Sequence, residues 1–157
     1  MQIISMRRVL FIAILFAAVS VIQANAQSVS GSIANGSVAR GGKAKGSIIL
    51  NIPGGLHVNS NRPASEYAIP TSVRLSASGV KVGSVNYPRG KNRKFQFSEN
   101  HINVYEGRAV FPFTVEVPEN FKGNAIRVRA VIRYQACTEE VCYPPKSAEV
   151  TLTAKVR

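Results

Sequence analysis

The sequence predicts an all-β protein, folded as a single immunoglobulin-like β-sandwich behind a signal peptide. Three observations support this fold class. Apolar and polar residues alternate with a period of two in five segments from residue 47 onward, which is the pattern of strands with one buried and one solvated face. Glycine- and proline-containing turns separate these segments. No segment shows a sustained helical stripe, so short strands punctuated by turns favour a sandwich.

The first 26 residues have the features of a secretory signal peptide. Arg7 and Arg8 precede the apolar run VLFIAILFAAVSVI, and Ala24 and Ala26 occupy the small-residue positions that a signal peptidase requires. The alternative is an uncleaved anchor, but the run is shorter than the roughly 20 residues that span a bilayer. We expect cleavage after Ala26 and export to the periplasm, without stable membrane insertion.

Residues 27–157 are then expected to form one domain. Residues 27–46, rich in glycine, serine and alanine, are expected to be a flexible or edge-forming lead-in. The five alternating segments are 47–53, 71–82, 107–117, 125–137 and 148–157. Their predicted inward faces are Ile48, Leu50 and Ile52; Val73 and Leu75; Ala109, Phe111, Phe113, Val115 and Val117; Ile126, Val128, Ala130, Ile132 and Tyr134; and Val150, Leu152, Ala154 and Val156.

The chain is strongly basic, with 20 lysines and arginines against eight acidic residues and a formal charge of +12. Loss of the leader lowers the charge to about +10, which favours loose attraction to anionic partners or surfaces. The densest basic run, residues 89–94, lacks the interleaved aromatic residues of a single-strand binder. We therefore expect no nucleic-acid partner.

Both cysteines of the chain, Cys137 and Cys142, lie in the stretch YQACTEEVCYPP. Disulfides persist in exported proteins. A bond between these two closes a ring of only six residues, for which the chain-entropy estimate is about 2 kcal/mol of stabilisation. This is a poor position for a bond whose purpose is to stabilise the domain.

The strand pattern predicts that both sulfur atoms are accessible. Cys137 continues the solvated face of its strand, in step with Arg133 and Gln135, and Cys142 opens the return segment. Two prolines then stiffen that segment near a sheet edge. Adjacent, accessible sulfur atoms in a short ring are what thiol exchange requires.

Other interpretations of the cysteine pair are compatible with the sequence. Glu139 and Glu140 raise the pKa of a nearby thiol and basic neighbours oppose them, so the sign of the shift is not settled by sequence. The pair can be an ordinary hairpin disulfide in a non-catalytic protein-binding module. Alternatively, two thiolates with His57 or His101 can bind Cu(I) or zinc, although C-x4-C spacing is specific for neither metal.

The same stretch resembles the cysteine hairpin of the N-terminal periplasmic domain of the thiol:disulfide interchange protein DsbD. That family's pattern is Tyr-Gln-x-Cys, a short loop, then Cys-hydrophobic-Pro-Pro. The block IPGGLHVNSNRP, residues 52–63, is similar to a second family segment, and the resemblance covers about residues 40–157. It implies an immunoglobulin-like sandwich without a cofactor or metal, whose cysteine pair relays electrons. The implied donors are a DsbD- or CcdA-like membrane transporter and thioredoxin-like proteins. The implied acceptors are oxidised periplasmic proteins, including those of cytochrome c maturation.

Carried over by position, the resemblance makes Cys142 the nucleophile and Cys137 the resolving thiol. The family's cap loop corresponds to KNRKFQFSEN, residues 91–100, with Phe97 as the shielding aromatic residue and Phe95 as the second candidate. The chain has Phe95 and Gln96 where well-studied members carry acidic residues. Its cysteine loop, with four intervening residues, is one shorter than in some members.

Five further residues are expected near the site: His57 and Asn59, which replace tyrosines of the family, and Tyr134, Tyr143 and Pro144 beside the cysteines. Because the chain ends at Arg157, we expect a stand-alone module with a separate electron source. The predicted activity is thiol:disulfide interchange of the protein-disulfide reductase type, in which Cys142 attacks a partner disulfide.

Overall fold

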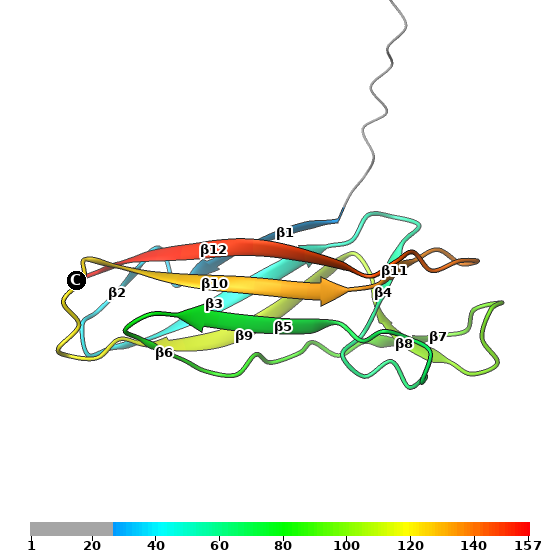
Figure 1. Ribbon diagram of the computed structural model, residues 1–157, viewed down its shortest axis with the longest axis horizontal. Coiled ribbons are helices and arrows are strands. Elements are labelled where there is room, and N and C mark those ends of the chain that lie inside the picture. Colours follow the sequence, from blue (N-terminus) through cyan, green and yellow to red (C-terminus); the bar gives the residue numbers. More distant parts are fainter. Residues whose placement is uncertain (1–26) are drawn as a thin grey trace, which may run out of the picture.

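The computed structural model describes residues 27–157, so the predicted signal peptide lies outside the described residues. Within residues 27–157 the chain forms twelve β-strands and no α-helix (Figure 1). In that part of the chain, no helix has the length and apolar character needed to cross a bilayer. The prediction of an all-β protein is confirmed.

Two four-stranded sheets form the body of the domain. The first has the order β1 (Ser28–Ile33), β3 (Lys43–Asn51), β9 (Arg108–Glu116) and β6 (Lys81–Val82). The second has the order β2 (Ser37–Val38), β12 (Lys146–Val156), β10 (Ala125–Tyr134) and β5 (Ser72–Ala77). All pairings are antiparallel except that of β12 with β2. Two facing sheets of this kind make an immunoglobulin-like sandwich, which confirms the predicted fold class.

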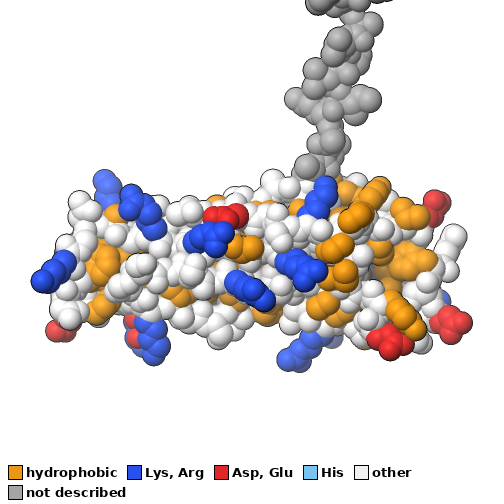
Figure 2. All heavy atoms as spheres, viewed as in Figure 1, with side chains coloured by type: hydrophobic (Ala, Val, Ile, Leu, Met, Phe, Trp, Pro, Cys, Tyr) orange, Lys and Arg blue, Asp and Glu red, His pale blue; other side chains and the backbone are white. Residues whose placement is uncertain are grey.

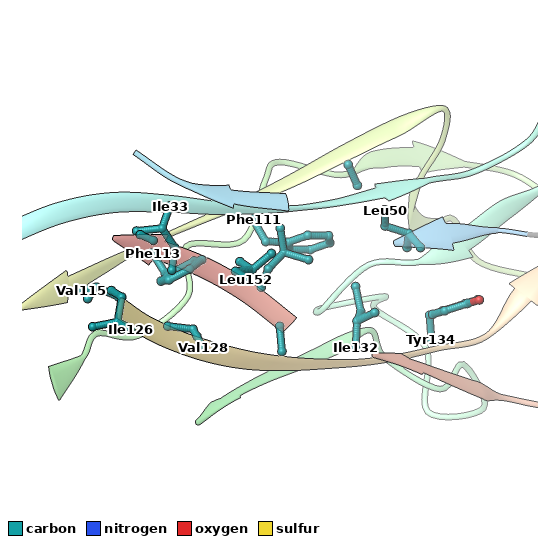
Figure 3. Close-up of a cluster of buried hydrophobic side chains, with 14 of the residues drawn as sticks. Ile33, Leu50, Phe111, Phe113, Val115, Ile126, Val128, Ile132, Tyr134 and Leu152 are labelled. Atoms are coloured by element: carbon teal, nitrogen blue, oxygen red, sulfur yellow. The ribbon is translucent and has the colours of Figure 1, made fainter. Parts of the chain in front are cut away.

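The interior between the two sheets is filled by the residues that the alternating pattern placed inward. Phe111 and Phe113 of β9 and Ile132 of β10 are at most 2% exposed, and Figure 3 shows such side chains reaching toward one another from the two layers. Gly46 lies opposite Phe113 in the pairing of β3 with β9, and its lack of a side chain makes room for the Phe113 ring. A Cβ atom at residue 46 would lie only 2.3 Å from that ring. Val73 and Leu75 are only partly buried, since β5 is an edge strand.

The lead-in is ordered, which corrects part of the sequence prediction for residues 27–46. The segment forms β1, β2 and the beginning of β3. β1 pairs with β3 along its whole length, and its last residue, Ile33, is completely buried. The segment is therefore edge-forming, as one of the two expectations had it, and these backbone hydrogen bonds and this burial exclude the flexible alternative.

A third, smaller sheet lies at one end of the sandwich (Figure 1). Its order is β11 (Ala136–Cys137), β4 (His57–Asn59), β8 (Ile102–Tyr105) and β7 (Lys91–Arg93). A separate small core of Phe95, Ile102 and Val104, with Ala68 against it, packs here. Both cysteines lie at this end.

Candidate functional site

The cysteine hairpin forms where the chain passes from one sheet to another. β10 ends at Tyr134, and after Gln135 the chain continues as β11, which pairs with β4 rather than with β12. The reversal is closed locally because the Thr138 hydroxyl accepts hydrogen bonds from the backbone N–H groups of Glu140 and Val141. Thr138 N–H also donates to the Val141 carbonyl at 2.8 Å.

Cys137 and Cys142 form a disulfide and face each other as an antiparallel bridge, with Cα atoms 4.0 Å apart. Their exposure is unequal: Cys137 is 0% exposed, whereas Cys142 is exposed. The prediction that Cys137 lies on the solvated face is therefore wrong. The alternation of β10 continues through Gln135 and Ala136 and is broken at Cys137, because Ala136 and Cys137 are both buried in the third sheet.

A pocket of about 620 Å³ opens beside Cys142. It is lined by residues 64–68 from one loop, by residues 97–100 of the predicted cap loop, and by Gln135 and Cys142. Phe97, the first candidate for the shielding residue, lines this pocket and is 42% exposed. The predicted cap loop and the cysteine hairpin therefore border the same space.

Three rings, two of them from the predicted cap loop, form a continuous stack. Phe97 stacks on Phe95 with centroids 5.2 Å apart, and Phe95 stacks on His57 with centroids 4.1 Å apart. Phe95 is 2% exposed and belongs to the small core. The two predicted cap aromatics thus occupy different places, with Phe97 at the pocket and Phe95 below it.

His57 lies directly opposite Cys137 in the pairing of β4 with β11. It is 3% exposed, and its Nε2 atom is buried without a hydrogen-bond partner. Burial lowers the pKa of the imidazole below its ordinary value because a charged ring loses hydration there, and Arg93 acts in the same direction. Glu139 and Glu106 oppose this shift.

Asn59 holds the base of the hairpin. Its side-chain amide donates to Gln135 Oε1 at 3.0 Å and to the Ile69 carbonyl at 3.2 Å. Gln135 in turn donates through Nε2 to the Tyr143 carbonyl at 3.2 Å. The sequence motif contained Gln135, but this tie between β4 and the cysteine hairpin was not predicted.

An ion pair holds the tip of the hairpin. Arg93 Nη2 lies 3.0 Å from the Glu139 carboxylate, and Arg93 also pairs with Glu106. The Arg93 guanidinium lies over the Phe95 ring, 5.9 Å from its centroid. Sequence analysis missed this role of Arg93, because residue 93 and residue 139 are brought together only by the tertiary fold.

The remaining near-site residues differ in accessibility. Tyr134 is 3% exposed and packs in the main core, and burial raises the pKa of its phenol. Tyr143 and Pro144 are exposed.

Large hydrophobic side chains that are exposed within residues 27–157 come from three segments around the disulfide: Tyr67, Phe97, Val141 and Tyr143. Hydrophobic side chains gather at this end of the surface in Figure 2.

The alternative hypothesis of a metal site requires several ligand side chains close together. Among residues 27–157, no three or more histidine, cysteine, aspartate or glutamate residues come together in a group that could hold a metal ion. His57 adjoins Cys137, whereas His101 is exposed.

Three solved structures are similar to the chain. The chain is similar to the N-terminal periplasmic domain of ScsB from Proteus mirabilis, with 14% identity, a TM-score of 0.54, and coverage of 82% of this chain and 47% of that one. It is also similar to the reduced DsbD N-terminal domain of Neisseria meningitidis, with 20% identity, a TM-score of 0.48, and coverage of 81% and 88%. A third similar structure is the complex of the DsbD and PilB N-terminal domains of Neisseria meningitidis, with 18% identity, a TM-score of 0.47, and coverage of 78% and 80%.

No curated protein sequence matches the chain. The sequence model of the family described as thiol:disulfide interchange protein DsbD, N-terminal, matches residues 29–154. That match spans the sandwich, the third sheet and the cysteine hairpin, and the two cysteines are at bonding distance, as thiol–disulfide exchange requires. The chain belongs to the family of DsbD N-terminal domains.

Proposed function

We propose that the Cys137–Cys142 pair passes electrons between proteins in the periplasm. A DsbD- or CcdA-like membrane transporter or a thioredoxin-like protein reduces the disulfide, and the resulting dithiol reduces an oxidised partner. The observation that carries this proposal is the unequal exposure of the pair, with Cys142 accessible and Cys137 buried behind it. Exchange needs one sulfur that a partner can reach and a second that releases the partner.

The reaction proceeds in two balanced steps. The Cys142 thiolate attacks one sulfur of the partner disulfide, forming a mixed disulfide and releasing the partner's second sulfur as a thiolate. The Cys137 thiol then loses its proton and attacks Cys142 Sγ, which forms the Cys137–Cys142 bond and releases the partner's first sulfur. The partner gains two electrons and takes up two protons, and the pair is oxidised.

The surface around Cys142 is suited to a protein partner. Tyr67, Phe97, Val141 and Tyr143 are exposed hydrophobic residues from three separate segments around the disulfide. Tyr67 is 87% exposed and shares the pocket with Cys142. Aromatic residues of this kind are enriched at protein interfaces. A partner whose cysteine reaches Cys142 would cover them.

The test is to trap the mixed disulfide. Cys137→Ala leaves Cys142 without its resolving thiol. When Cys142 is first converted to its mixed disulfide with 2-nitro-5-thiobenzoate, the variant should form stable covalent complexes with thioredoxin-like proteins whose own resolving cysteine is removed, because their remaining thiolate attacks Cys142 Sγ and releases the coloured thiolate. Cys142→Ala is the matched control and should trap none. Absence of any complex with Cys137→Ala would defeat the relay function.

The alternative of a binding module with a structural disulfide predicts a different result. The Cys137→Ser/Cys142→Ser variant would still bind the partner, and the reduction potential of the wild-type pair would lie below about −300 mV, as in inert structural bonds. A more positive potential favours exchange.

A further inference from the structure

Three residues of the site lie side by side across the third sheet. Cys142 faces Cys137 through an antiparallel bridge, and Cys137 faces His57 in the pairing of β11 with β4. Residues directly opposite each other in antiparallel strands share one face, with Cβ atoms about 4.5–5.5 Å apart. The buried cysteine therefore lies between its disulfide partner and an imidazole.

His57 has an unpartnered ring nitrogen in this position. The residue is only 3% exposed, and its Nε2 atom is buried without a hydrogen-bond partner. Buried polar atoms are nearly always hydrogen-bonded, so an unpartnered one calls for an explanation. In the disulfide form Cys137 has no proton to donate, whereas in the dithiol form it carries an S–H group.

We propose that His57 is the proton acceptor for Cys137, taking the thiol proton onto Nε2 when Cys137 attacks the mixed disulfide. This inference rests on the proposed function, because it assigns the proton of the resolving step. The Cys137 S–H bond breaks and the proton moves to Nε2. The Cys137–Cys142 bond forms, the bond from Cys142 to the partner breaks, and the partner leaves as a thiolate. The imidazolium then returns its proton to that thiolate or to water.

The surroundings of His57 suit this role. Burial holds the imidazole neutral at pH 7, so that it can accept a proton. Charged groups act on the ring from three elements: Glu139 of the hairpin loop, Glu106 after β8, and Arg93 of β7. The two carboxylates favour the imidazolium once it forms and Arg93 disfavours it. Stacking on Phe95 fixes the orientation of the ring.

The experiment uses 5,5′-dithiobis(2-nitrobenzoate) with the reduced full-length mature protein. Cys142 attack releases one coloured thiolate, and Cys137 attack on the resulting mixed disulfide releases the second. The second phase therefore isolates the resolving step without a protein partner. His57→Phe keeps a ring to stack on Phe95 but removes both nitrogens. His101→Phe is the matched control at an exposed histidine.

In the wild-type protein the second-phase rate should be nearly independent of pH between about 6.5 and 8, since neutral His57 accepts the proton. In His57→Phe the rate should fall by about tenfold or more at pH 7. It should then rise about tenfold per pH unit toward the ordinary thiol pKa of about 8.5. The first phase should not change, and His101→Phe should match the wild type in both phases.

Unchanged second-phase kinetics in His57→Phe would overturn the inference and leave the relay function intact. Absence of a second phase in the wild type would instead defeat the relay function itself. If His57→Phe does not fold, His57→Gln takes its place in the same two-phase assay, because a glutamine amide cannot act as a proton acceptor at this pH. A second phase in His57→Gln with the rate and pH dependence of the wild type would likewise overturn the inference.

Discussion

Phe95 stacks on His57 with the ring centroids 4.1 Å apart and the planes inclined by 17°. This contact joins the cap loop to the strand that pairs with Cys137. Because Phe95 is 2% exposed and Phe97 is 42% exposed, the two phenylalanines of the cap loop should make different contributions to stability and to protection of the disulfide.

We predict that Phe95→Ala lowers the free energy of unfolding by about 3 kcal/mol, as for removal of a buried aromatic ring. Phe97→Ala should cost less than about 1 kcal/mol but should speed reduction of the disulfide by a small thiol such as dithiothreitol. Urea unfolding of the oxidised proteins measures the first effect, and the rate of reduction measures the second. Equal, small stability losses in both variants would contradict the placement of Phe95 in the small core.

The unequal exposure of the two cysteines predicts their order of reaction. In the reduced protein Cys142 should be alkylated by iodoacetamide about tenfold faster than Cys137 or more, because a buried thiol reacts slowly whereas an exposed one is accessible. Mass spectrometry of peptides after partial alkylation measures the ratio. In guanidinium chloride the preference should disappear. A native preference for Cys137 would contradict the assignment of Cys142 as the nucleophile.

The hydrogen bond between Asn59 and Gln135 predicts energetic coupling between β4 and the hairpin. Asn59→Ala should lower the free energy of unfolding by about 2 kcal/mol, since it removes a buried hydrogen bond and leaves acceptors unsatisfied. Combined with Gln135→Ala, it should cost about 1 kcal/mol less than the sum of the single changes. Additive single and double variants, measured by urea unfolding, would show that the two side chains act independently.

The lowered pKa of His57 predicts a specific loss of stability in mild acid. The unfolded histidine titrates near 6.5, whereas the folded one titrates lower because of burial. Below about pH 6.5 the unfolded state therefore binds a proton that the folded state does not, and stability falls as the pH falls. The unfolding free energy of the wild type minus that of His57→Phe should decrease from pH 7 to pH 5.

A matched comparison separates this effect from the carboxylates. The pKa values of Glu116 and Glu149 are lowered, chiefly by side-chain hydrogen bonds from Lys43 and Arg129 respectively, so their contributions are lost only at more acidic pH. A wild-type minus His57→Phe difference that stays constant between pH 7 and pH 5 would contradict the lowered pKa of His57.

Strand alternation was enough to predict the sandwich, because each long strand buries one face. Phe111 and Phe113 of β9 and Ile132 of β10 are buried as their positions in the pattern require. The third sheet was not predicted, since strands of two to four residues are too short to show a period. For the same reason Cys137 was placed on the wrong face: the pattern of β10 was extended across Gln135, where the chain changes its partner strand.

The cysteine pair could be identified as the candidate site from its spacing and from the residues beside it in the sequence. The residues that surround the pair in the folded chain could not be identified in this way. Tyr67 shares the pocket with Cys142 although it lies in a loop with no periodic signal. Arg93 lies in β7, at the opposite edge of the small sheet from β11, and its pairing with Glu139 forms only in the folded chain. Contacts of this kind depend on tertiary packing between loops, for which local sequence carries little information.

The ring closed by Cys137 and Cys142 contains six residues and lies at one extremity of an elongated domain (Figure 1). Opening so small a loop releases little chain entropy, and the ladders of the two large sheets do not depend on it. Reduction should therefore cost the domain no more than about 2 kcal/mol and leave both large sheets folded. Under the proposed function, the scaffold of the domain would stay folded through repeated oxidation and reduction of the pair.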